Sequence, residues 1–142
     1  MGLLTSQLGK QRLLSVELPV IERYNAERAA DFRIRIQRSE AGMSLHYKLK
    51  PCHNTYQLVT TLPADYPSAP PETRVLTELR PCPHLLHNQV LCMWRQSSHR
   101  DNHRWDPAKY SCIFAIQAAW RWLACYEIWA VTGDWPFPDA QQ

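Results

Sequence analysis

Apolar and polar residues alternate in four short stretches between residues 32 and 79 of the chain. The stretches are residues 32–36, 45–49, 56–62 and 73–79, and this period of two is typical of strands with one buried face. Gly42 and the turn-rich run at residues 51–54 separate the first three stretches. Because the connections are short, the pattern predicts an antiparallel four-stranded meander.

Helical spacing appears near the start of the chain. Leu4, Leu8 and Leu14 recur at roughly helical intervals over residues 3–16, and Pro19 predicts the end of this first helix. The pattern leaves residues 19–30 open between a second helical turn and an irregular entry to the sheet.

A longer helix is predicted after residue 105. Asp106 and Pro107 indicate its start, with the carboxylate as N-cap and the proline at the first helical position. The segment that continues to Ala130 is apolar around much of its circumference, so it must be covered, and Gly133 and Pro136 end it. An N-terminal helix, a four-stranded sheet and a long C-terminal helix together predict an α+β fold.

Composition places the chain among globular proteins. Its 142 residues suit one domain over residues 1–142, and 45% hydrophobic with 20% charged residues provides material for a core. The net charge of +3 is modest, and Arg33, Arg35 and Arg38 are interpreted as a solvated strand surface, so no nucleic acid partner is predicted. No apolar run reaches the length of a signal peptide or a membrane span, so we expect a cytoplasmic protein without a membrane partner.

Five cysteines, an odd number, favour free thiols over a disulfide framework in a reducing compartment. Cys52, Cys112 and Cys125 are interpreted as packing residues, because they fall in a turn and in the apolar helix. Cys92 differs from them: it follows the apolar pair Val90 and Leu91 and a stiff, proline-rich stretch. This is how a nucleophile would be presented.

Three motifs surround Cys92 in a fixed order. They are Tyr-Pro-Ser-Ala-Pro-Pro at residues 66–71, the segment from Pro81 to Cys92, and Trp-Asp-Pro at residues 105–107. The chain closes with Trp-Leu-Ala-Cys-Tyr-Glu-Ile-Trp at residues 122–129 and Thr-Gly-Asp-Trp-Pro at residues 132–136. Over about its last two thirds, the chain resembles the ubiquitin-conjugating enzymes, and within them the divergent bacterial members.

The resemblance implies the fold of that family, with an active-site loop between sheet and long helix. It also implies thioester chemistry on Cys92: the thiol accepts an acyl group, the C-terminus of a protein substrate, and passes it to an amine. The family's His-Pro-Asn motif corresponds to Cys82, Pro83 and His84, so His84 stands eight positions before the nucleophile, where the family keeps the asparagine that serves the tetrahedral intermediate. A neutral His84 would donate one hydrogen bond and an imidazolium two, or the residue could brace the loop.

No cofactor is predicted. The four glycines, at positions 2, 9, 42 and 133, are not clustered, and the usual phosphate cradles need glycine-rich loops. The activated acyl group must therefore come from elsewhere. The polar segment at residues 95–104 is expected to form a loop beside the site that either binds the acceptor or is solvated.

Two alternatives stay open. Cys82, His84, His87 and Cys92 have residue types that bind zinc, although the gap from Cys82 to His84 is tighter than usual. The chain could also be a non-catalytic binding module with the same fold. Small stand-alone bacterial proteins of this appearance are found in CBASS antiphage operons. There the resemblance implies action on the C-terminus of a cGAS-like nucleotidyltransferase (CD-NTase).

Overall fold

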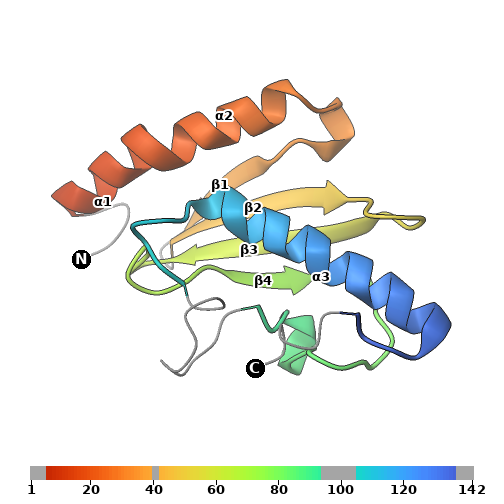
Figure 1. Ribbon diagram of the computed structural model, residues 1–142. Helices are drawn as coiled ribbons and strands as arrows, with labels where there is room; N and C mark the ends of the chain where they lie inside the picture. The colour runs from red at the N-terminus through yellow and green to blue at the C-terminus, as the bar shows by residue number, and fades with distance from the viewer. Residues whose placement is uncertain (1–5, 40–41, 94–104, 137–142) are drawn as a thin grey trace.

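The computed structural model describes residues 6–39, 42–93 and 105–136, which form an α+β fold (Figure 1). Four antiparallel strands make one sheet in the order β1-β2-β3-β4. Their bounds are Arg35–Ser39 for β1, Gly42–Leu49 for β2, Tyr56–Pro63 for β3 and Glu72–Val75 for β4. The predicted meander is therefore confirmed, although the first strand begins later and the last ends earlier than the alternation suggested.

The two faces of the sheet differ in burial. In β2, Met43, Leu45 and Tyr47 are buried, while Ser44 and His46 on the other face are only half-buried. The buried face packs against α3, Cys112–Thr132, which crosses the sheet in Figure 1 and contributes Ile116 and Leu123 to the core. The opposite face stays open, and the alternation in the sequence reflects this one-sided cover.

The first strand, β1, lies at the edge of the sheet and begins later than the sequence predicted. A short 3₁₀ turn, η2 at Ala30–Phe32, precedes it, and all five residues of β1 are exposed. Arg33, Arg35 and Arg38 are exposed too, as the solvated interpretation expected. At the next turn, Gly42 has a φ of 134°, and a Cβ at this position would lie 2.1 Å from the carbonyl oxygen of Leu62. Only glycine fits there.

Pro19 does not end the N-terminal helix, so that prediction is wrong. The helix runs through α1, Gln7–Arg12, the π-helical turn η1, Leu13–Glu17, and α2, Leu18–Ala26. The N–H of Leu18 bonds to the carbonyl oxygen of Leu13, five residues back, and Pro19 then occupies the first turn of α2. A proline is tolerated there because its missing N–H falls where the hydrogen-bond register changes.

The predicted start of the long helix is also wrong. The N-cap of α3 is Ser111, whose hydroxyl accepts a hydrogen bond from the N–H of Ile113 at 3.3 Å. Asp106 instead closes a separate turn, in which its carbonyl oxygen accepts from the N–H groups of Lys109 and Tyr110, both at 3.0 Å. The helix does end at Gly133, as predicted, in the left-handed conformation with a φ of 83°.

No helix among the described residues is both long enough and apolar enough to cross a membrane.

Candidate active site

The segment that carries Cys92 lies against the free edge of β4. The N–H of Leu91 donates to the carbonyl oxygen of Thr73 at 2.9 Å, and Val90 forms a bridge with Arg74. On its other side, the segment pairs with the chain that precedes it, because the N–H of Leu86 donates to the carbonyl oxygen of Val90 at 2.7 Å. Leu91 faces the core, with 4% of its surface exposed. Cys92 is thus presented from a short extension of the sheet.

His84 is the direct backbone neighbour of Cys92. The carbonyl oxygen of His84 accepts hydrogen bonds from the N–H of Cys92 and from the indole Nε1 of Trp122, both at 3.1 Å. His84 has a φ of 64°, in the left-handed region that is uncommon for a residue with a side chain. The structure therefore brings the two predicted site residues together and fixes the backbone of His84 from two sides.

The imidazole of His84 packs against an aromatic wall. Its ring centroid lies 4.9 Å from that of Trp135, at an interplanar angle of 64°. Burial lowers the pKa of His84. Because an unperturbed histidine titrates near pH 6.5, the lowered value leaves the ring neutral at physiological pH, where it donates one hydrogen bond rather than two.

The thiol of Cys92 is half-buried, and this burial raises its pKa. At neutral pH the resting residue is therefore a thiol, not a thiolate. Burial also raises the pKa of the neighbouring motif cysteine, Cys82, to about 11, against an opposing effect of Arg80. Neither cysteine is poised as a free thiolate, so both are held at rest in the protonated form, which is the less reactive one.

Two of the other motifs contact each other. The indole Nε1 of Trp105 donates to the carbonyl oxygen of Pro67 at 2.7 Å, and the rings of Trp105 and Tyr66 lie 5.7 Å apart. The proline-rich turn and the Trp-Asp-Pro motif thus form one contact. The predicted loop at residues 95–104 lies outside the described residues.

A buried ion pair between Arg12 and Glu17 also contacts the proline-rich turn, and sequence patterns did not predict it. Glu17, fully buried in the π-helical turn, accepts from Nε of Arg12 and from the hydroxyl of Tyr66, both at 2.7 Å, and from the N–H of Cys112 at 2.9 Å. Arg12 also donates to the carbonyl oxygens of Pro107 at 2.7 Å and Tyr110 at 2.6 Å. One carboxylate therefore joins the N-terminal helix, the proline-rich turn and the start of α3.

The described part of the chain does not bring zinc-type residues together into a metal-binding group. Among the described residues, no group of three or more histidine, cysteine, aspartate or glutamate side chains could hold a metal ion, and the set Cys82, His84, His87 and Cys92 is included in that search. Of the three cysteines interpreted as packing residues, Cys112 and Cys125 are buried and burial raises the pKa of each. Cys52 is exposed, so the packing interpretation is wrong for it.

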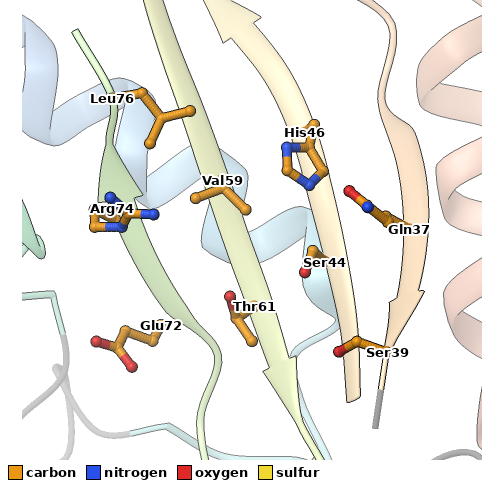
Figure 2. Close-up of a pocket in the computed structure, with 9 residues that line it drawn as sticks. All are labelled: Gln37, Ser39, Ser44, His46, Val59, Thr61, Glu72, Arg74 and Leu76. Carbon is orange, nitrogen blue, oxygen red and sulfur yellow. The ribbon is translucent and has the colours of Figure 1, made fainter. Parts of the chain in front are cut away.

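A hollow of about 410 Å³ lies elsewhere, on the open face of the sheet. Figure 2 shows Gln37, His46, Thr61, Glu72 and Arg74 around it, drawn from all four strands. Neither Cys92 nor His84 lines this hollow. The candidate site therefore lies apart from this hollow, and its described features are its backbone pairing and its aromatic wall.

The family of the chain follows from a comparison with known protein families. The family described as "Type II CBASS E2 protein" matches residues 22–142. The chain belongs to this E2-CBASS family. The match begins in α2 and so extends further toward the N-terminus than the motif resemblance did. It gives the protein an E2-like role in CBASS.

The architecture is that of the ubiquitin-conjugating fold. A solved structure described as "A complex of the Vps23 UEV with ubiquitin" is similar with a TM-score of 0.51 and 18% sequence identity, over 83% of this chain and 84% of that chain. At this identity the likeness shows the fold alone. No curated protein matches the chain.

Proposed function

We propose that this E2-CBASS protein carries an acyl group as a thioester on Cys92 and transfers it to an amine. The observation that carries the proposal is the placement of a partly buried thiol beside His84, in a chain of the E2-CBASS family. A thioester divides a difficult acyl transfer into two easier steps.

In the first step, the sulfur of Cys92 attacks the carbonyl carbon of an activated carboxylate, such as an acyl adenylate or another thioester. The thiol proton is lost to the surroundings, and the leaving group departs with its bonding electron pair. In the second step, an amine attacks the thioester carbonyl and loses one proton, the carbon–sulfur bond breaks, and Cys92 leaves as a thiolate that takes up a proton in turn. The product is an amide or isopeptide bond.

Both steps place negative charge on the carbonyl oxygen, so a fixed hydrogen-bond donor beside the thiol lowers the barrier. His84 is the candidate for this donor. Its backbone is anchored by Cys92 and Trp122, and its lowered pKa keeps the ring neutral, with one N–H to donate. A role as a brace for the loop is the competing interpretation.

The acyl group proposed here is the C-terminus of a protein, and in CBASS a cGAS-like nucleotidyltransferase is the proposed donor of that C-terminus. The reaction would take place in the cytoplasm, in the one domain formed by residues 1–142. The described residues contain no phosphate-binding glycine-rich loop, which supports activation of the carboxylate by a separate protein.

The test is to isolate the protein with Cys92 intact and to search by mass spectrometry for an acyl adduct that thiol reagents release. Cys92→Ala should abolish the adduct, and Cys92→Ser should trap a less labile ester. Cys52→Ala is the matched control, because Cys52 is exposed and lies on the turn between β2 and β3. An adduct that survives in Cys92→Ala contradicts the proposal, and an adduct absent from the intact protein favours the non-catalytic binding module.

A further inference from the structure

The turn after α3 returns the chain to the active-site segment. The N–H of Gly133 donates to the carbonyl oxygen of Trp129 at 2.8 Å, and the N–H of Asp134 donates to the hydroxyl of Thr132 at 3.1 Å. That hydroxyl in turn donates to the carbonyl oxygen of Ile128 at 2.9 Å. These bonds fix the direction in which the next residue, Trp135, leaves the helix.

The Trp135 ring packs against the rings of two site residues, His84 and Trp122. Its ring centroid is 4.9 Å from that of His84 and 5.1 Å from that of Trp122, and both contacts have an interplanar angle of 64°. Such edge-to-face packing orients both rings. The indole N–H of Trp122 donates to the backbone carbonyl oxygen of His84, whereas Trp135 contacts the imidazole ring. The two tryptophans therefore contact different parts of the histidine.

The indole nitrogen of Trp135 takes no part in this arrangement. Nε1 is buried and has no hydrogen-bond partner within the described part of the chain. Trp135 therefore contacts His84 and Trp122 through the faces and edges of its rings alone. A phenylalanine at this position would keep a ring and would lose no hydrogen bond.

We propose that Trp135 is a positioning residue that fixes the orientation of the His84 imidazole and excludes water from one side of it. This inference rests on the proposed function, in which His84 donates to the oxyanion beside Cys92. Among the described residues, the recorded contacts of His84 are with the backbone N–H of Cys92, the indole N–H of Trp122 on α3 and the ring of Trp135, and none of these three contacts involves a charged group. Burial is accordingly the cause of the lowered pKa of His84.

The test compares Trp135→Phe, Trp135→Leu and the intact protein, with Trp120→Leu as the matched control because Trp120 lies on the exposed side of α3 with 46% of its surface exposed. Nuclear magnetic resonance follows the titration of His84 in each. In Trp135→Leu the midpoint should rise toward that of a solvated histidine, and discharge of a preloaded Cys92 to an amine should slow roughly 10- to 100-fold. Trp135→Phe should discharge within about threefold of the intact protein, and Trp120→Leu should change neither quantity.

Nuclear Overhauser contacts between the rings of His84 and Trp135 in the intact protein provide a readout that needs no variant. Their absence overturns the inference, as does a folded Trp135→Leu protein in which His84 titrates unchanged. If His84→Ala discharges normally while Trp135→Leu still shifts the His84 titration, the positioning by Trp135 stands and the proposed role of His84 is wrong. The two failures are therefore distinguishable.

Discussion

The N–H of Cys92 donates a hydrogen bond to the carbonyl oxygen of His84 at 3.1 Å. This bond closes the loop between the two residues, together with the bond from Leu86 to Val90 and the bridge between Leu85 and Leu91. The spacing between the backbones of Cys92 and His84 is therefore set by this strand-like pairing. An insertion or deletion inside this loop would shift the register of the pair.

We expect His84 to act mainly on discharge. Loading of Cys92 and discharge to an amine should be measured separately in His84→Ala and His84→Asn. If His84 donates to the tetrahedral intermediate, alanine should slow discharge roughly 10²–10³-fold, the usual cost of one oxyanion donor, and asparagine should restore part of the loss.

The competing role as a brace has a different signature. Because His84 sits at a φ of 64°, a bracing residue replaced by alanine would lower the melting temperature and slow both half-reactions together. Asparagine tolerates this backbone conformation better than alanine and also donates, so the melting temperatures of the two variants show how much of any rescue comes from relieved strain. A stable His84→Ala protein with normal discharge would remove His84 from the site.

The reactivity of Cys92, and with it the rate of loading, should increase as the pH rises. Since burial raises the pKa of Cys92, the thiolate that attacks the acyl donor is scarce at pH 7 and increases as the pH rises. The rate of alkylation by iodoacetamide, followed by peptide mass spectrometry, should keep rising beyond the pH at which a solvated cysteine such as that of glutathione levels off. A plateau near pH 8 would contradict the effect of burial.

The buried carboxylate of Glu17 should stabilise the fold strongly through its hydrogen bonds to Arg12, Tyr66 and Cys112. Glu17→Ala leaves Arg12 without its carboxylate and removes the acceptor for Tyr66 and for the N–H of Cys112. Breaking a buried pair in this way typically costs about 3–5 kcal/mol in the free energy of unfolding. Denaturant titration checks this value.

Glu22→Ala is the control for this experiment, because Glu22 is an exposed glutamate on the same helix. It should change the free energy of unfolding by no more than about 0.5 kcal/mol. Equal effects of the two substitutions would show that the Glu17 network adds nothing beyond helix propensity.

Zinc should not be a stoichiometric part of the protein. Pro83 stiffens the short gap between Cys82 and His84, and the structure does not assemble these residues with His87 and Cys92 into a metal-binding group. Elemental analysis should find less than one zinc per chain, and a chelator should leave the melting temperature unchanged. One zinc per chain that is lost in Cys82→Ala would restore the zinc interpretation.

Local patterns in the sequence determined the strands and the presentation of Cys92. The alternation in β2 and β3 required one buried face, and a sheet of four such strands with short turns has few other topologies than the observed meander. The order of the motifs around Cys92 indicated the family, which the match over residues 22–142 confirms.

Helix boundaries were predicted less well, because they depend on a competition between local signals and packing. Pro19 is a strong helix breaker in isolation, yet the π-helical turn places it where no N–H is needed. Asp106 and Pro107 have the residue types of a helix start, but Arg12 binds the carbonyl oxygens of Pro107 and Tyr110 and holds them in a separate turn.

Only the tertiary structure decided what surrounds the thiol. Glu17 meets Tyr66 across 49 positions of sequence, and Trp135 meets His84 across a similar separation. The free energy of such contacts comes from burial and from hydrogen bonds that form once the sheet and α3 have packed, and no period of two or of 3.6 residues encodes them. The sequence thus supplies the thiol and its neighbour, and packing decides the orientation and the protonation state of each.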